Sequence, residues 1–199
     1  MFSLMSAPTL PQAENRVLPP KKTDLSSYGV VTDANSAIVI DPASGATLFA
    51  KNADDVRPIG SITKLMTALV FLDTQPDLTT WVTIEKDDYV GGGRVYLNFN
   101  DGIRLEDVLG ASVVGSDNTA TQSLSRMSGM SGEEFIVAMN AKAKTLGMTS
   151  SAFTEVTGLD SRNVSTARDL HMLLAEAKKS EILSEFMTTK RLPISHVSG

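Results

Sequence analysis

The sequence predicts an α+β domain in which a cluster of helices packs against an antiparallel sheet. Two short segments rich in β-branched residues lie near the N-terminus, and the turn between them predicts a hairpin. Residues 61–72, which follow, are apolar on most faces and predict a buried helix. Beyond residue 105 the apolar positions recur with helical spacing. Because a hairpin cannot bury its apolar face alone, helices packed against it give a layered domain.

The first half of the chain carries the predicted strands, which are residues 36–40, 46–50 and 81–84. Asp41–Gly45 forms the turn of the hairpin, and this turn is longer than the common two-residue type. Pro58-Ile59-Gly60 ends the strand pattern immediately before the apolar helix. The run Gly91-Gly92-Gly93 predicts a flexible loop.

The second half predicts helices and the signals that begin and end them. Helices are predicted over residues 105–114, 119–127, 131–146, 165–179 and 181–189. Gly115 separates the first two of these helices. Ser131 and Glu134 form a capping-box pattern at the start of the third, and Gly147 follows its end.

Composition excludes several classes of protein and partner. The net charge of −5 offers no basic surface for nucleic acid, and the absence of cysteine excludes a disulfide framework and a thiolate nucleophile. No apolar run approaches the roughly 20 residues of a membrane-spanning helix. Residues 1–27 are rich in proline and predict a lead-in or the remnant of a signal segment, whereas residues 28–199 predict one domain.

Ser61 and Lys64 are the first candidate pair for chemistry. Their spacing places a hydroxyl and an amine on one helix face, one turn apart. A serine becomes nucleophilic when a base takes its proton, and a lysine can be that base if burial lowers its pKa. The helix dipole favours developing negative charge at this terminus. The alternative interpretation of the pair is an N-cap serine and a surface lysine.

Ser116 and Asn118 are the second candidate pair. A second hydroxyl could relay a proton, and a carboxamide could hold a substrate amide. The chain contains another Ser-x-Asn at Ser161 and Asn163, which follows a polar loop. We favour Ser116 because it follows a buried-looking apolar stretch, which gives a site rigid support. The alternative interpretation of Ser116 to Asn118 is a simple helix break with a cap.

Together these motifs resemble those of the serine DD-peptidases, the low-molecular-mass penicillin-binding proteins of the D-alanyl-D-alanine carboxypeptidase family. The similarity covers about residues 28–190 and is carried by several segments. These are Ser36 to Asp41 with Gly45, Pro58 to Ala68, Asp101-Gly102, Leu105 to Leu109, Leu146 to Met148, Phe153, Thr157 to Asp160, and Ser165 to Leu170. The resemblance implies a β-lactamase/DD-peptidase-like fold, with a helical cluster and an antiparallel sheet.

The resemblance also implies a role for each motif residue. Ser61 would be the acylated nucleophile, its backbone N–H one half of the oxyanion hole, and Lys64 its general base. Ser116 would relay a proton to the leaving D-alanine nitrogen, and Asn118 would bind the substrate backbone. Asp117 is expected to be a capping or solvent residue. Neither His171 nor His196 is assigned to a metal, and no cofactor is expected.

One motif of the family has no counterpart in these residues. The family carries Lys-Thr-Gly or His-Thr-Gly on a strand after the second motif, and neither tripeptide occurs here. Lys144-Thr145-Leu146 lacks the glycine and lies in a predicted helix. Residues 28–199 are therefore expected to be a partial, C-terminally truncated catalytic domain with an incomplete sheet. An open sheet edge, an open flank beside Ser61 and little turnover by these 199 residues follow from that expectation.

The implied function is that of a D-Ala-D-Ala carboxypeptidase acting on peptidoglycan stem peptides through an acyl-enzyme on Ser61. A DD-endopeptidase and a non-catalytic relative that binds cell-wall peptide or penicillin are the alternatives. A class A β-lactamase is disfavoured because no Glu-x-x-Leu-Asn string occurs. The expected partners are stem peptides and β-lactams, with no nucleic acid. Action outside the cytoplasm is expected, with membrane association through a C-terminal segment beyond these residues.

Overall fold

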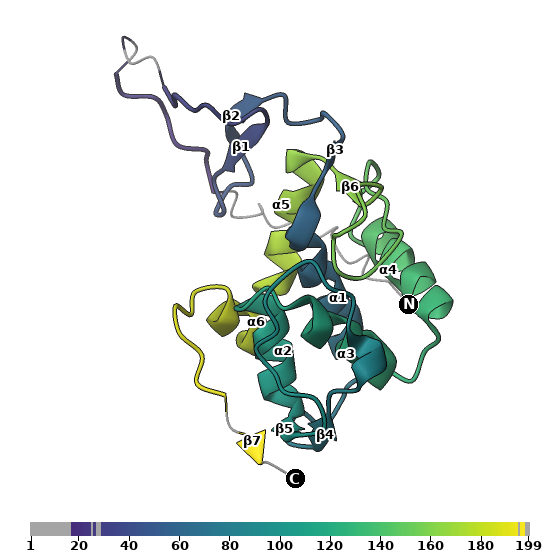
Figure 1. The fold of residues 1–199 in the computed structure, drawn as a ribbon. Coiled ribbons are helices and arrows are strands. Elements are labelled where there is room, and N and C mark those ends of the chain that lie inside the picture. The colour runs from purple at the N-terminus through teal and green to yellow at the C-terminus, as the bar shows by residue number, and fades with distance from the viewer. Residues whose placement is uncertain (1–16, 25, 27–28, 195, 198–199) are drawn as a thin grey trace, which may run out of the picture.

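The computed structural model describes residues 17–24, 26, 29–194 and 196–197 (Figure 1). Most of the lead-in predicted for residues 1–27 lies outside this described part. Within it, residues 17–24 form no helix or strand. The remaining residues form a cluster of helices with short strands at its margins, so the predicted α+β class is confirmed.

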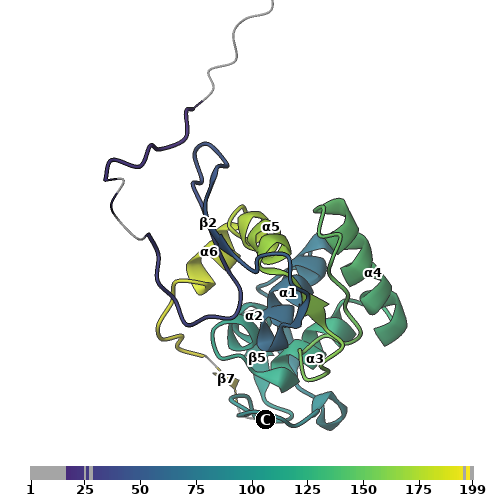
Figure 2. The ribbon, with the colours of Figure 1, turned by 90° about the horizontal axis from the view of Figure 1, so that it is seen from above.

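A central helix, α1 (Thr63–Asp73), organises the cluster. Four longer helices contact it or pack beside it, and one short helix contacts α2. These helices are α2 (Leu105–Val113), α3 (Asn118–Met127), α4 (Gly132–Thr145), α5 (Ala167–Ala177) and the short α6 (Glu181–Phe186). Seen from above, α1 lies between the other helices (Figure 2). Its first nine residues are all buried, which confirms the helix predicted to be apolar on most faces.

The core consists of large apolar side chains that α1 shares with its neighbours. Met66 and Phe71 of α1 are fully buried, as are Leu109 of α2, Leu124 of α3 and Phe135 of α4. Burial of each such side chain contributes about 1.5–3 kcal/mol. Because side chains from three neighbouring helices pack on α1, its orientation is fixed from several directions.

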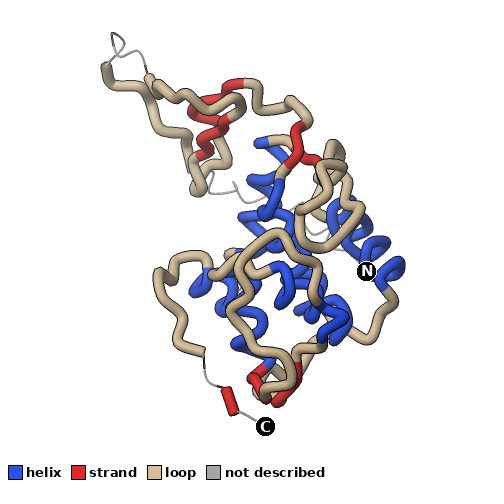
Figure 3. Tube along the Cα trace, viewed as in Figure 1, coloured by secondary structure: helices blue, strands red, loops and turns tan. Residues whose placement is uncertain are grey.

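The strands form three small antiparallel sheets instead of the single sheet that the sequence predicts (Figure 3). The three sheets are β1 (Ala37–Ile40) with β2 (Thr47–Lys51); β3 (Arg57–Pro58) with β6 (Val164–Ser165); and β4 (Trp81–Thr83) with β5 (Gly102–Arg104) and β7 (His196–Val197). The segments predicted at residues 36–40, 46–50 and 81–84 are confirmed as strands. The other four strands, β3, β5, β6 and β7, were not predicted. They have only two or three residues each, too few to show an alternating pattern.

The β1–β2 hairpin is closed by the turn that the sequence predicts. The backbone N–H of Gly45 donates to the carbonyl of Asp41 at 2.8 Å, and the Ser44 N–H donates to the Asp41 carboxylate at 2.9 Å. Gly45 has a φ of 71°, a conformation that glycine adopts without strain. Within the described part of the chain this hairpin pairs with no third strand, and Leu48 is half exposed. The expected open sheet edge is therefore present in these residues.

The helix ends follow the predicted signals. Ser131 and Glu134 form a reciprocal capping box at the start of α4, and Gly147 follows the end of this helix with a φ of 79°. Thr166 caps α5 through a hydrogen bond from the Asp169 N–H at 3.0 Å. Among the described residues, no helix is both long and apolar enough to cross a membrane.

An ion pair fastens the long loop before α2 to helix α3. The Asp88 carboxylate is buried and accepts from the Nε and Nη2 atoms of Arg126, each at 2.8 Å. It also accepts from the Ser123 hydroxyl and the Glu85 N–H, each at 2.9 Å. Burial alone would raise the pKa of Asp88, but these hydrogen bonds hold it below the usual value. The carboxylate is therefore charged and depends on Arg126.

We predict that Arg126→Ala lowers the free energy of unfolding by about 3 kcal/mol, because it leaves a buried carboxylate without its partner. The matched control is Arg162→Ala. Arg162 pairs with Asp160 on the surface, where solvent screens the pair, so its loss should cost much less. Urea unfolding at pH 7 measures both values. Equal losses in the two variants would contradict this account of the Asp88 site.

Candidate active site

Ser61 and Lys64 meet at the start of α1. Ser61 lies in a short 3-10 turn, Gly60–Ile62, that leads directly into the helix, and Lys64 occupies the first turn of α1. The Lys64 Nζ atom is 3.0 Å from the Ser61 Oγ atom. Ser61 is exposed, whereas Lys64 is only 2% exposed. The one-turn spacing thus brings an accessible hydroxyl to a buried amine.

The environment of Lys64 makes it a weaker base than an ordinary lysine. Burial lowers the pKa of Lys64 to about 8, while the carboxylates of Glu155 and Asp117 act in the opposite direction. The Nζ atom also donates to the carbonyl of Thr157 at 2.6 Å. A neutral amine held in this way keeps a lone pair for the proton of Ser61. Near neutral pH a usable fraction of Lys64 is then deprotonated.

Ser61, Lys64 and Ser116 line one cavity of about 390 Å³. Its remaining lining comes from α1, from α2 and the residues after it, from α5, and from α6 and the residues after it. These residues are Ile62, Leu65, Ser112, Val113, Val114, Leu174, Phe186, Met187 and Thr189. Ile62 and Leu174 are each more than two fifths exposed, so the expected open flank beside Ser61 is present.

The backbone of Ser116 is held in an unusual conformation. Its φ is 54°, in the left-handed region that non-glycine residues rarely occupy. Such residues persist where the surrounding structure imposes the conformation, often at functional sites. Here Ser116 lies between α2 and α3, and the N–H of the next residue, Asp117, donates to the Ala111 carbonyl at 3.1 Å. The helix break predicted at Gly115 therefore turns a hydroxyl toward the cavity.

Asn118 does not join Ser61 and Ser116 among the residues that line this cavity. Its Nδ2 atom donates to the Gly91 carbonyl at 2.9 Å, and the side chain is 5% exposed. In this conformation Asn118 contacts the glycine loop and does not line the Ser61 cavity. The predicted glycine loop lies close to Asn118: Gly92 has a φ of 75°, a conformation that favours glycine, and a Cβ atom there would lie 3.2 Å from Asn118 Nδ2.

Asp117 is the N-cap of α3, as the capping interpretation expects. Its Oδ1 atom accepts from the Ala120 N–H at 3.0 Å, and Oδ2 accepts from the Tyr96 N–H at 2.8 Å. The residue is fully buried, so the alternative of a solvent residue is wrong. Asp117 therefore joins the glycine loop to the helix that carries Asn118.

The competing Ser-x-Asn at Ser161 and Asn163 lies away from the cavity. Ser161 is exposed, whereas Asn163 is fully buried. The Asn163 side chain accepts from the Thr154 N–H at 2.7 Å and donates to the Thr63 hydroxyl at 3.1 Å. It holds a turn together, and the geometry supports the choice of Ser116.

The sequence analysis missed the residues that hold Lys64 from outside its helix. Thr63, Lys64 and Thr67 are buried polar residues on one face of α1, and each bonds to the segment 155–163. Thr67 donates to the Val156 carbonyl at 2.6 Å. We call these contacts the polar seam. Its signal in the sequence was the presence of three polar residues at one-turn spacing in an apolar helix.

No group of three metal-ligating side chains occurs among the described residues. The site consists of a serine beside a buried lysine, with a second serine in the same cavity. It lies on a cluster of helices with small sheets. These features define the class of serine enzymes that pair the nucleophile with a lysine. The chain belongs to the D-alanyl-D-alanine carboxypeptidase family, whose sequence model matches residues 23–196.

Relatives and solved structures agree with this assignment. The chain is 35% identical over 192 residues to a D-alanyl-D-alanine endopeptidase of Escherichia coli (strain K12), a match that covers 96% of this chain and 62% of the relative. It is 40% identical over 168 residues to the corresponding endopeptidase of Haemophilus influenzae, covering 83% and 56%. The crystal structure of the Streptomyces K15 DD-transpeptidase superposes with a TM-score of 0.78 at 27% identity, covering 86% and 74%. The chain thus spans only 62% and 56% of these two relatives.

We predict that the Lys64 side chain titrates at about pH 8, because burial disfavours its charged form. An ordinary lysine titrates at about 10.4. Side-chain NMR of the isotope-labelled protein measures the midpoint, and the Lys64→Met variant identifies the signal by its loss. A midpoint near that of an ordinary lysine would show that the amine is more solvated than the structure indicates.

Proposed function

We propose that this chain carries the acylation site of a serine-type D-Ala-D-Ala carboxypeptidase, with Ser61 as nucleophile and Lys64 as general base. The observation that carries the proposal is the 3.0 Å contact between Ser61 Oγ and the buried Lys64 Nζ. The position of Ser116 in the same cavity supports it, as does membership of the family. The substrate class is the peptidoglycan stem peptide, and β-lactams are expected to bind as its mimics.

In the proposed reaction neutral Lys64 takes the proton of Ser61, and Oγ attacks the carbonyl carbon of the penultimate D-alanine. The backbone N–H of Ser61 stabilises the negative charge that develops on the carbonyl oxygen. Ser116 passes its proton to the leaving nitrogen and takes the proton that Lys64 removed from Ser61, so that the amide bond breaks, an ester on Ser61 remains, and Lys64 is neutral again. Water then hydrolyses this ester and restores the serine.

Asn118 is proposed to bind the backbone of the substrate. One of its amide hydrogens is already donated to the Gly91 carbonyl. A carboxamide has two such hydrogens. The substrate can therefore use the second, or displace the glycine loop to reach the first.

An endopeptidase is the second candidate, and the comparisons contain an observation in its favour. The relatives named endopeptidases are 35–40% identical to this chain, whereas those named carboxypeptidases are 29–32% identical. The two reactions share the acylation step. They differ in the leaving amine, which is free D-alanine in one case and a neighbouring stem peptide in the other. Either reaction places the protein outside the cytoplasm, where peptidoglycan lies.

We predict that a labelled penicillin attaches to Ser61 in a full-length version of the protein and that Ser61→Ala abolishes the label. Ser116→Ala should slow labelling by about 10²-fold or more, because proton transfer typically contributes that much. Ser161→Ala, in the look-alike motif, should label at the native rate because Ser161 is exposed and does not line the cavity. Gel fluorescence and peptide mapping give the rate and the site. An unchanged label on the Ser61→Ala variant would remove Ser61 as nucleophile.

Product analysis separates the three functions in play. With stem pentapeptides and cross-linked dimers as substrates, a carboxypeptidase releases D-alanine and an endopeptidase converts dimers to monomers. A non-catalytic relative binds or is labelled by penicillin and forms neither product. We expect D-alanine release to dominate in a full-length version and little of either product from these 199 residues, measured by chromatography with the Ser61→Ala variant as blank. Dimer cleavage without D-alanine release would favour the endopeptidase instead.

A further inference from the structure

All acceptor positions of the Glu155 carboxylate are occupied by donors from the turn at residues 155–158 and from Asn163. Its Oε2 atom accepts from the Thr157 N–H at 2.7 Å and from the Thr157 hydroxyl at 2.6 Å. Its Oε1 atom accepts from the Gly158 N–H and from Asn163 Nδ2, the latter at 2.8 Å. A carboxylate has about four acceptor positions, and four donors occupy them here.

The turn that Glu155 closes is the one that touches the base. The Thr157 carbonyl accepts from Lys64 Nζ at 2.6 Å, and the Val156 carbonyl accepts from the Thr67 hydroxyl at 2.6 Å. Thr157 is only 2% exposed, so water has little access to replace its carbonyl as the partner of the amine. The position of Lys64 therefore depends on the conformation of residues 155–158.

The same turn also lies against the peptide of the nucleophile. Gly158 has a φ of 89°, and a Cβ atom there would overlap the Gly60 carbonyl and lie 2.9 Å from the Ser61 nitrogen. Only a glycine permits this approach. One turn thus contacts both the amine of Lys64 and the backbone of Ser61.

We propose that Glu155 is a positioning residue for acylation at Ser61: it fixes the 155–158 turn so that the Thr157 carbonyl holds Lys64 against the nucleophile. This inference rests on the proposed function for its catalytic meaning. The carbonyl takes one hydrogen of the neutral amine, which turns the lone pair toward Ser61 Oγ. Glu155 itself does not act as a base on water, because all four of its acceptor positions are occupied by the turn and Asn163.

The charge of Glu155 provides a readout that a purely structural role would not move. Two carboxylates act on the Lys64 amine, Glu155 from the turn and Asp117 from the start of α3. Both raise the pKa of Lys64 against the larger lowering by burial. Removal of the Glu155 charge should therefore move the Lys64 midpoint to a lower pH, whereas a shorter carboxylate should leave it nearly in place.

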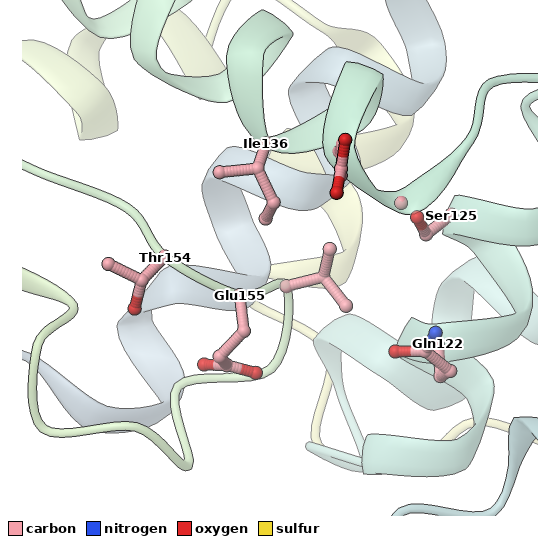
Figure 4. A pocket seen from close by; sticks show the side chains of 8 residues that line it. Gln122, Ser125, Ile136, Thr154 and Glu155 are labelled. Atoms are coloured by element: carbon pink, nitrogen blue, oxygen red, sulfur yellow. The ribbon is translucent and has the colours of Figure 1, made fainter.

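A second cavity supplies a matched control. Glu155 also lines a cavity of about 510 Å³ between α3 and α4, together with Thr154, Ile136, Ser125 and Gln122 (Figure 4). Gln122 projects from α3 on the side of this cavity away from Glu155. A change at Gln122 perturbs the cavity without removing a bond of the turn.

The test compares Glu155→Gln, Glu155→Asp and Gln122→Ala by NMR titration of Lys64, by penicillin acylation of Ser61 above the Lys64 midpoint, and by thermal unfolding. We expect Glu155→Gln to lower the Lys64 midpoint and to slow acylation between about tenfold and a hundredfold, as small misplacements of a catalytic group do. Glu155→Asp should restore the midpoint but not the full rate, since its carboxylate is one methylene closer to the backbone. Gln122→Ala should have the native Lys64 midpoint and the native acylation rate.

Two results would overturn the proposal. One is a folded Glu155→Gln variant with the native Lys64 midpoint and acylation rate. The other is a loss of thermal stability alone, with the rate above the midpoint unchanged. If Glu155→Gln does not fold, the acylation rate of Glu155→Asp decides: a rate below the native value supports the proposal, and the native rate contradicts it. If the native protein is not acylated at all, the proposed function fails, while the Lys64 titrations still show whether Glu155 controls the amine.

Discussion

The amine of Lys64 is buried at the start of the most buried helix of the molecule, and much of the surrounding structure follows from that placement. An amine withdrawn from water costs several kcal/mol unless it finds partners or loses its proton. Lys64 has a partner, because it bonds to the Thr157 carbonyl. It also loses its proton more easily, because burial lowers its pKa to about 8. The helix cannot supply that carbonyl from its own backbone. A separate segment, distant in sequence, has to be brought to α1 and held there.

The polar seam performs this task and ties the fold to the site. Asn163 bonds to Thr63 of α1 and to the backbone of Glu155, so it ties the first residue of the turn to the helix. The Asn163 carbonyl also accepts from the Ile59 N–H at 3.1 Å, next to the pairing of β3 with β6. This pairing fixes the chain immediately before Ser61. Ser61 and Lys64 are thus aligned by the same few hydrogen bonds, and among the described residues no buried side-chain polar atom lacks a partner.

The other wall of the site is built by a different set of constraints. Ser116 turns into the cavity through a left-handed backbone, and Asp117 buries its carboxylate to cap α3 and hold Tyr96. Asn118 is drawn toward Gly91 by the close glycine loop. The second motif is therefore divided in this conformation, with its serine in the cavity and its asparagine against the loop. The substrate contact proposed for Asn118 would use the spare amide hydrogen or need a shift of that loop.

The sequence by itself determined the features that depend on neighbouring residues. These include the apolar helix after Ser61, the capping box at Ser131, the hairpin turn at Asp41, and the one-turn spacing of Ser61 and Lys64, because local periodicity and local hydrogen bonds produce them. The sequence missed β3, β5, β6 and β7, because strands of two or three residues carry little alternating pattern. Only the tertiary structure decided which carbonyl holds Lys64 and which residue of α1 Asn163 reaches, because these partners lie about 90 to 100 residues apart in the chain. Such contacts form when packing brings distant backbone to a buried amine, and no local pattern encodes them.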